Sequence, residues 1–227
     1  MKKQNVTVDK IILEGELTYK DVKVLHYKIE YPKFTGIFFQ RMLGELNLLY
    51  KARAITFQQT CVQQLLCEAS KQYDEAVSNG YPFHMFEAYI VFEVTYNCDC
   101  TISLYFDKYE YKGGAHGATV RSSDTWSLSK ECCLLLCDMF PSSVSYKAYA
   151  MQAINNQIAE QIEQGTGFYF DDYQRLVARY FNQRSFYLTM EGVAVYYQQY
   201  EIAPYASGIP VFILPYELGC VLRPQCR

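Results

Sequence analysis

The first third of the chain changes from a strand-like to a helix-like pattern of apolar positions. Residues 22–31 alternate between apolar and polar side chains within an extended region, residues 6–32, that runs into Pro32 and so suits a strand end. Across residues 35–79 apolar side chains recur at helical spacing with no proline between them. We therefore expect one long helix or two joined helices, ended by Asn79-Gly80.

The alternating pattern of a half-buried strand returns over residues 86–112. Asn97-Cys98-Asp99 carries turn-forming residues in the middle of this region, so the pattern predicts a hairpin. The segment from Gly113 to Gly117 interrupts the alternation, which resumes over residues 118–128. Glycine permits backbone conformations that other residues avoid, so this interruption predicts a bulge or a tight turn.

Two helices are predicted in the second half of the chain. Ser142 or Ser143 can cap the first, which we expect to end at Gly165. Its apolar positions are Met151, Ile154, Ile158 and Ile162. Asp171 or Asp172 can cap the second, which is short.

The last part of the chain predicts strands again. Residues 185–189 and 193–197 flank Glu191-Gly192 and predict another hairpin. Residues 209–214 predict a final strand, and Pro215 could open a short helix after it.

This order of elements predicts an α+β fold, with antiparallel sheets built from hairpins, a long N-terminal helical segment and further helices packed on the sheets. We expect two α+β domains, residues 1–112 and residues 113–227, packed as one unit. The best boundary lies near residues 112–118, since no flexible linker or internal repeat is present.

Composition narrows the possible partners. The net charge is −3 and the basic residues form no stripe, which argues against nucleic acid and against an anionic membrane surface. Polar residues follow Met1-Lys2-Lys3 where a signal peptide would be apolar, and no stretch has the length of a membrane span. We expect a cytoplasmic protein; the alternative is an extracytoplasmic domain whose anchor has been removed.

Nine cysteines are present, and their odd number leaves at least one thiol unpaired. Without a signal peptide, reduced and mostly buried cysteines are the simpler interpretation. A disulfide or a metal site is the alternative, and the closest groupings for it are Cys98 with Cys100, and Cys132 and Cys133 with Cys137. Neither grouping has the spacing of a structural zinc site, so we expect no metal and no cofactor.

Two tyrosine-containing segments with glycines carry the candidate site. Tyrosine is unusually abundant, with 22 among 227 residues, and its apolar body with a polar tip suits contact surfaces. The candidate binding residues are Tyr109, Tyr111, Gly113, Gly114, His116 and Gly117 in the first segment, and Tyr200, Glu201, Pro204 and Tyr205 in the second. The second segment could be a recognition loop or a corner packed on a sheet.

His116 is the sharpest candidate for chemistry, because backbone between small residues can approach a ligand closely. The structural alternative is that its imidazole bonds to a neighbouring backbone group. The carboxylates near the two segments, Asp107, Glu110 and Glu201, are expected to be solvated at the rim. No glycine-rich phosphate loop and no Gly-x-Ser-x-Gly motif occurs in the chain.

Five stretches carry a family resemblance. Tyr109-Glu-Tyr-Lys-Gly-Gly-Ala-His-Gly, Ser123-Asp-Thr-Trp-Ser-Leu, Leu136-Cys-Asp-Met-Phe, Phe186-Tyr-Leu-Thr-Met-Glu-Gly-Val and Tyr200-Glu-Ile-Ala-Pro-Tyr-Ala-Ser-Gly occur in this order. Together they resemble the C-terminal domain of unknown function found in RsiV-type proteins. Residues 10–110 resemble the domain that usually precedes it, which also precedes the deacetylase domain in PdaC-like proteins.

The resemblance implies an α+β binding or sensing module. RsiV is a membrane-anchored anti-sigma factor whose outer domain recognises lysozyme, but this sequence has neither the transmembrane helix nor a segment typical of sigma-factor binding. We therefore expect a non-catalytic binding protein whose partner is a protein such as lysozyme or a cell-wall fragment. The alternatives are a glycan-acting enzyme that uses His116 with a nearby carboxylate, and a metal or redox module built on the cysteines.

Overall fold

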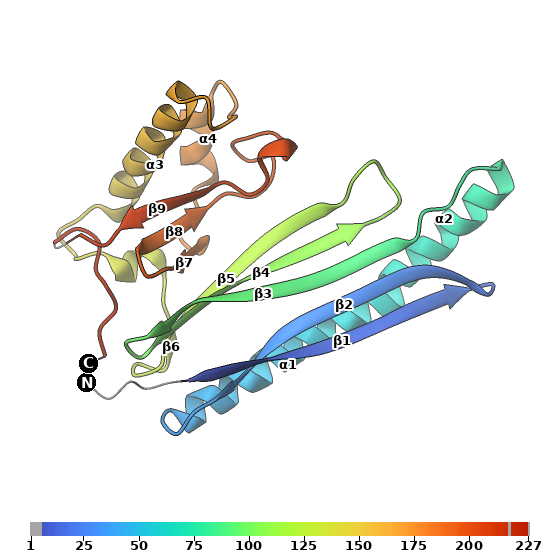
Figure 1. Cartoon of the computed structure of the whole chain (residues 1–227), viewed down its shortest axis with the longest axis horizontal. Helices are drawn as coiled ribbons and strands as arrows, with labels where there is room; N and C mark the ends of the chain where they lie inside the picture. The colour runs from blue at the N-terminus through green and yellow to red at the C-terminus, as the bar shows by residue number, and fades with distance from the viewer. Residues whose placement is uncertain (1–5, 218, 227) are drawn as a thin grey trace. The chain divides into compact units, whose positions relative to one another are not determined.

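The structure is a computed structural model that describes residues 6–217 and 219–226 (Figure 1). Its elements, in chain order, are β1 (Thr7–Tyr19), β2 (Val22–Thr35), α1 (Gln40–Thr60), the π-helical turn η1 (Cys61–Leu65), α2 (Leu66–Asn79), β3 (Phe86–Cys98), β4 (Thr101–Tyr111), β5 (Ala118–Ser127), β6 (Cys132–Cys133), η2 (Leu136–Met139), α3 (Tyr146–Glu163), α4 (Tyr173–Tyr180), β7 (Phe186–Leu188), β8 (Gly192–Tyr196), η3 (Tyr205–Ser207) and β9 (Val211–Pro215). This mixture of helices and largely antiparallel strands confirms the α+β class.

The strands form two sheets, one in the order β1-β2-β3-β4-β5-β6 and one in the order β7-β8-β9. The pairs β1–β2, β5–β6, β7–β8 and β8–β9 are antiparallel, as expected. The pair β2–β3 is parallel, which the sequence did not predict. A parallel pair needs a long crossover between its strands, and the continuous helical segment from α1 to α2 provides it.

The described residues fall into two compact units, each of which has most of its residue contacts within itself. The N-terminal unit contains residues 6–92 and 106–120, and the C-terminal unit contains residues 93–105, 121–217 and 219–226. Strands β3, β4 and β5 contribute residues to both units. The boundary proposed near residues 112–118 stays a prediction.

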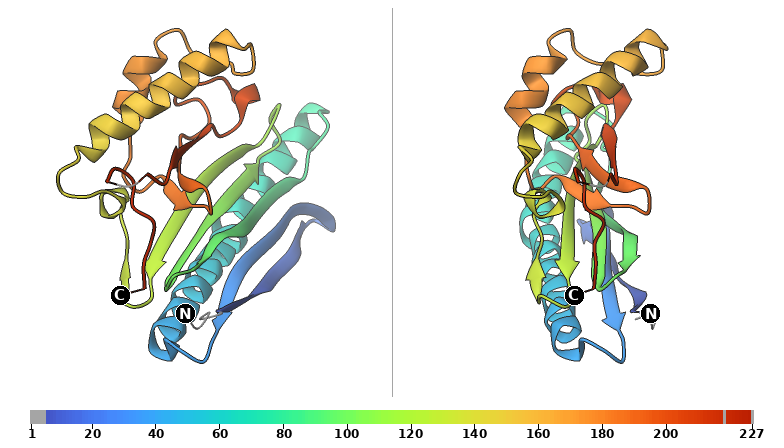
Figure 2. Two further views of the ribbon diagram at one scale, coloured as in Figure 1. Left: turned by 60° about the vertical axis from the view of Figure 1, so that its left-hand side comes forward. Right: turned by 90° about the vertical axis from the view of Figure 1, so that its left-hand side faces the viewer.

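In the N-terminal unit, α1, η1 and α2 cover one face of the strands (Figures 1 and 2). Their core consists of Val24, Leu25, Tyr27, Ile29, Ala54, Phe57, Cys61, Leu65, Ala69, Phe86 and Ala88. Burial raises the pKa of the Cys61 thiol to about 11, so this cysteine stays a protonated core residue. The helix begins at Gln40, later than residue 35, and ends as predicted at Asn79 because Gly80 takes the left-handed conformation of a C-cap.

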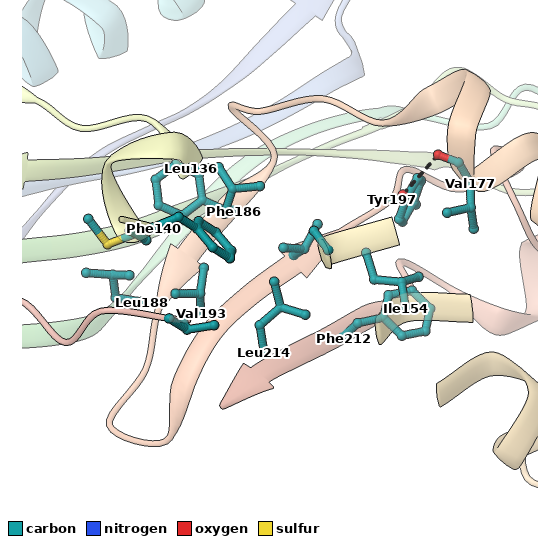
Figure 3. Close-up of a cluster of buried hydrophobic side chains, with 14 of the residues drawn as sticks. Leu136, Phe140, Ile154, Val177, Phe186, Leu188, Val193, Tyr197, Phe212 and Leu214 are labelled. Atoms are coloured by element: carbon teal, nitrogen blue, oxygen red, sulfur yellow. Dashed lines mark hydrogen bonds between the residues drawn. The ribbon is translucent and has the colours of Figure 1, made fainter. Parts of the chain in front are cut away.

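The C-terminal unit packs one face of its three-stranded sheet on α3 and α4 (Figure 3). Ile154 of α3 and Val177 of α4 belong to the same buried cluster as side chains from all three strands, among them Phe186, Val193 and Phe212. The hydroxyl of Tyr197 donates to the Val177 carbonyl at 3.1 Å, which satisfies two polar groups inside this core. Burial raises the pKa of Tyr197, so it keeps the proton that this bond requires.

Two local predictions in this unit were wrong, and a third was right about the N-cap residue but not about its side chain. The helix α3 begins at Tyr146 with Ser145 at its N-cap, so neither Ser142 nor Ser143 caps it. Asp172 is the N-cap of α4 as expected, but its carboxylate accepts from Arg175 and makes no side-chain cap. Pro215 ends β9, and the described residues after it contain no helix. The hairpin of β7 and β8 around Glu191 is as predicted.

Strand β7 lies at an edge of its sheet, and hydroxyl side chains satisfy two of its backbone groups. The Leu188 amide donates to Ser103 Oγ at 2.9 Å, and Ser123 Oγ donates to the Phe186 carbonyl at 2.5 Å. Ser103 is fully buried and also bonds Thr125 Oγ1 at 2.7 Å. Serines of β4 and β5 therefore provide the hydrogen bonds that a further strand would otherwise supply.

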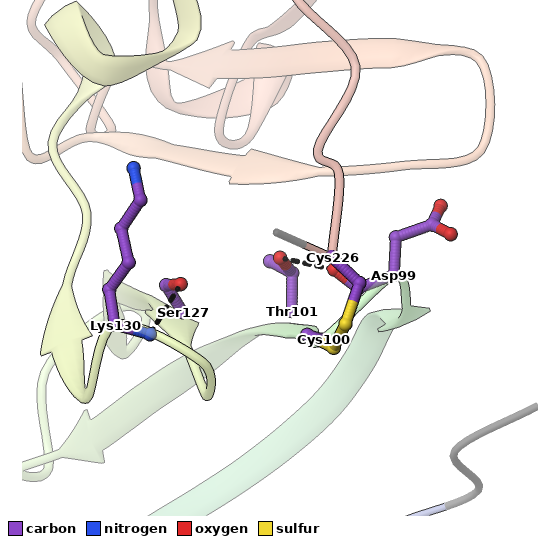
Figure 4. Close-up of a disulfide and its surroundings, with 6 residues drawn as sticks. All are labelled: Asp99, Cys100, Thr101, Ser127, Lys130 and Cys226. Atoms are coloured by element: carbon purple, nitrogen blue, oxygen red, sulfur yellow. Dashed lines mark hydrogen bonds between the residues drawn. A yellow bond between two sulfur atoms is a disulfide. The ribbon is translucent and has the colours of Figure 1, made fainter.

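Cys100 and Cys226 form a disulfide with a Cα–Cα distance of 5.0 Å (Figure 4). The expectation of reduced, mostly buried cysteines was therefore wrong for this pair. Cys67, Cys132 and Cys133 are free cysteines, as expected, but they are exposed, so the expected burial was wrong for them. Among the described residues, no group of three or more His, Cys, Asp or Glu side chains has the geometry of a metal site.

Gly192 faces Pro215 across the β8–β9 pair, where a side chain has no space. A methyl group at this position would overlap the Leu214 carbonyl oxygen, which is backbone and cannot rotate away. We expect Gly192→Ala to lower the free energy of unfolding by about 1–3 kcal/mol. Chemical denaturation would measure this, with Gly114→Ala as the control, because no atom lies within 4 Å of a methyl group there. Equal stability of the two variants would contradict the prediction.

Candidate binding site

The two candidate segments lie in different units. Tyr109, Tyr111 and the glycine segment belong to the N-terminal unit, whereas Tyr200 to Tyr205 belong to the C-terminal unit.

Gly113 lies in the connection between β4 and β5 and has a φ of 76°, a conformation that favours glycine. A Cβ atom here would lie 2.8 Å from Gln72 Oε1 of α2. The absence of a side chain therefore lets the amide of Gln72 approach the loop. Next to this contact, Lys112 donates to Glu68 of α2 at 2.9 Å.

A cavity of about 230 Å³ opens where Gly113 meets the end of α2. Its lining is Gln72, Glu75, Ala76, Asn79, Tyr81, Pro82, Phe83, His84 and Gly113. Gln72 Oε1 is buried, and no hydrogen-bond donor reaches it from the part of the chain that the structure describes. Asn79 donates its amide hydrogen to the Glu75 carbonyl at 2.7 Å, so its own amide oxygen remains an acceptor.

The chemistry of this lining favours a ligand that donates hydrogen bonds. Carbonyl oxygens of Gln72 and Asn79 and the carboxylate of Glu75 accept, while Tyr81 and Phe83 add aromatic surface. Tyr81 is 69% exposed, so its ring is available for contact. Hydroxyl and ammonium groups match such a site, the latter also through the aromatic rings.

Sequence reasoning placed Gly113 in the site but missed Gln72, Glu75 and Asn79. A usable signal existed, because these side chains follow one another at helical spacing of three to four residues along α2. This row of α2 is polar, whereas the face by which a helix packs on its own core is apolar.

Tyr109 of the first segment is one of two stacked tyrosines on the sheet. The rings of Tyr89 and Tyr109 stack with centroids 5.9 Å apart, and a methyl group on Gly117 would overlap the Tyr109 ring. His26 links Tyr89 to Glu14, with ring nitrogens 3.1 Å from Tyr89 Oη and 3.0 Å from Glu14 Oε1. Tyr111 is half-buried and Gly114 is exposed.

His116 is exposed and does not line the cavity. Its Nδ1 lies 3.0 Å from the Gly117 carbonyl oxygen, so this nitrogen donates a proton to backbone. This contact is the structural alternative considered for His116.

The second segment combines an exposed tyrosine, its half-buried aromatic neighbour and two buried residues. The rings of Tyr200 and Tyr205 lie 5.8 Å apart, and Tyr200 is 54% exposed with a φ of 66°, unusual for a residue with a side chain. Ile202 and Ala203 between them are buried. The segment is thus a corner packed on the core that also carries the exposed ring of Tyr200. Pro204 is half-buried at the start of η3.

Glu201 is not the solvated rim carboxylate that was expected. Burial raises its pKa, although the Gln198 backbone amide, which donates to Glu201 Oε2 at 2.7 Å, acts in the opposite direction. The Gln198 side chain in turn bonds both backbone groups of Arg121, at 2.9 and 2.7 Å. Glu201 therefore positions this loop against β5.

A second cavity, of about 370 Å³, lies beside the disulfide and contains none of the predicted residues. Charged side chains of both signs line it: Lys130, Asp138, Glu217 and Arg223. Figure 4 shows Lys130, Ser127 and Thr101 near the disulfide, with the Lys130 amide donating to Ser127 Oγ.

Comparison with known families gives two matches along the chain. Residues 19–119 match the family described as Deacetylase PdaC, and residues 138–217 match the family described as Protein of unknown function (DUF3298). The chain thus carries a PdaC-type domain followed by a DUF3298-type domain. No curated protein sequence matches it significantly.

Two crystal structures share the fold. A DUF3298 family member from Bacteroides fragilis has a TM-score of 0.72 at 18% identity, covering 94% of this chain and 91% of the other. A DUF3298 family protein from Pseudomonas aeruginosa PAO1 has a TM-score of 0.59 at 17% identity, covering 96% and 94%. No helix among the described residues is long and apolar enough to cross a membrane.

Proposed function

We propose that this chain is a non-catalytic binding or sensing protein, and that the cavity at Gly113 receives a donor-rich group of its partner. The partner in this proposal is a protein such as lysozyme or a fragment of the cell wall. The observation that carries it is the buried Gln72 Oε1, which no donor of the described residues reaches.

An acceptor buried without a donor costs about 1–3 kcal/mol. A ligand that brings a hydroxyl or ammonium group to Gln72 Oε1 removes this cost, and binding gains accordingly. The cavity volume of about 230 Å³ is smaller than the roughly 300–1,000 Å³ typical of sites for drug-sized ligands. It suits one side chain or one sugar residue of a larger partner.

The choice of partner rests on the RsiV-type resemblance of residues 109–117 and 200–208. Both segments carry aromatic side chains. The exposed ring of Tyr200, beside the half-buried Tyr205, adds a second contact surface of the kind enriched in protein interfaces. The contact of His116 with the Gly117 carbonyl supports a structural role for that histidine. The proposal therefore does not include the glycan-acting enzyme.

Isothermal titration calorimetry with lysozyme and with soluble cell-wall fragments tests the proposal. We expect one of the two ligands to bind, and Gln72→Leu to weaken its binding by about 5- to 150-fold, because the acceptor is lost. Lys71→Ala is the matched control, since Lys71 is exposed on the same helix outside the cavity.

The proposal fails if neither ligand binds. The role of the cavity fails separately if Gln72→Leu binds as tightly as the unmodified chain while Tyr200→Ala does not. That result would leave the Tyr200 segment as the contact surface.

A further inference from the structure

The strand β1 is a long sheet edge. It pairs with β2 along its length, from Thr7 to Tyr19, and it ends the strand order of its sheet in the part of the chain that the structure describes. Figure 1 shows β1 at the margin of the sheet. The backbone amides and carbonyls on the outer side of such a strand are a template for pairing with another strand.

The side chains of β1 are complementary to themselves when a second β1 runs in the opposite direction. With Ile12 facing Ile12 of the second copy, Lys10 faces Glu14 and Glu14 faces Lys10. These three side chains share one face of the strand, because successive side chains alternate between faces. Ile12 is 45% exposed, and the Lys10 and Glu14 side chains are 50% and 52% exposed.

The opposite face of the strand is complementary in the same arrangement. There Ile11 faces Leu13 of the second copy, and Leu13 faces Ile11. Leu13 already packs at the margin of the core beneath α1 and α2. The arrangement would therefore extend this apolar layer from one copy into the other.

Registers centred on the residue before or after Ile12 lose the Lys10–Glu14 and Ile12–Ile12 pairs. If Leu13 were at the centre, Ile12 would face Glu14; if Ile11 were at the centre, Lys10 would face Ile12. Both place Ile12 opposite a charge. In the register centred on Ile12, the apolar side chain that meets a charge is Val8, which faces Glu16 four residues from the axis. The pattern of β1 therefore favours one register, and charges at an edge otherwise act against unspecific pairing.

We propose that two copies of this chain associate through antiparallel pairing of their β1 strands, with the two-fold axis at Ile12. The pairs Lys10–Glu14 flank the axis on both sides, as cross-strand pairs of opposite charge do in stable sheets. Each copy uses its single β1 edge, so the assembly closes as a dimer and does not grow into a fibre. The ion pairs of Lys10 with Glu30 and of Glu14 with His26 lie within each copy, because Glu30 and His26 belong to the neighbouring strand β2.

Sedimentation velocity and multi-angle light scattering over a concentration series test the proposal on the full chain. We expect a monomer–dimer equilibrium for the unmodified protein. Ile12→Lys and Ile12→Glu place like charges at the two-fold axis, so each variant alone is expected to raise the dissociation constant at least about tenfold. An equimolar mixture of the two variants is expected to dimerise again, with one copy of each, as measured by native mass spectrometry.

Val77→Lys is the matched control, since Val77 is an apolar residue, 62% exposed, that lies on α2 and is not part of β1. It should dimerise like the unmodified protein. Amide hydrogen exchange gives a readout that needs no variant, because protection of β1 should rise with protein concentration. The inference is overturned if the unmodified chain stays monomeric, if dimers persist in both Ile12 variants, or if mixing the variants restores nothing.

Discussion

Loss of the disulfide between Cys100 and Cys226 is expected to lower the free energy of unfolding by about 2–5 kcal/mol. The bond joins residues 126 positions apart, so it restricts a long stretch of the unfolded chain. Because that restriction disappears with the bond, Cys100→Ser and chemical reduction of the unmodified chain should destabilise the protein to a similar extent. Urea denaturation followed by circular dichroism would measure both.

Cys67→Ser is the control for the disulfide experiment, because Cys67 is an exposed free cysteine. It should change stability by no more than about 0.5 kcal/mol. A reducing agent should have no further effect on Cys100→Ser. If reduction leaves the unmodified protein unchanged, the predicted contribution of this bond is wrong.

Ser103→Ala is the second substitution for which we expect a large effect, about 2–4 kcal/mol of lost stability. The Ser103 hydroxyl accepts from the Leu188 amide and bonds Thr125, all inside the C-terminal unit. Ser103 and Thr125 are 0% and 1% exposed, so water does not replace the lost bonds. Each buried group left without a partner costs about 1–3 kcal/mol.

A double-mutant cycle separates the two bonds of Ser103. Thr125→Val removes the bond to Thr125 only, and it should cost less than Ser103→Ala because the Leu188 amide keeps its acceptor. The double variant should lose less than the sum of the two single losses, since one bond is shared. Strict additivity would contradict a direct bond between the two hydroxyls.

Much of the fold could be predicted because its signals are local. Alternation over residues 86–112 predicted β3 and β4, and the left-handed preference of Gly80 marked the end of α2. The parallel pairing of β2 with β3 could not be predicted, because alternation shows that a strand is half buried but not which strand lies beside it. The start of α3 was misplaced for a related reason, since several serines precede it and each can cap a helix.

The candidate site was predicted only in part. Gly113 was identified because glycine marks places where backbone comes close to another group. Its neighbour Gln72 lies in a helix far away in sequence, and only the fold brings the two together. The partner of Cys100 was missed likewise, because nine cysteines allow many pairings and spacing alone does not select Cys226.

The same disulfide also determines how the chain would respond to mechanical tension. A pull applied at Cys226 passes through the sulfur atoms to Cys100, so residues 101–225 form a closed loop that carries no load. At about 3.3–3.6 Å per extended residue, that loop hides on the order of 400 Å of contour length while the bond is intact. Reduction would release this length, so the unfolded chain can extend further under force in the reduced protein than in the oxidised protein.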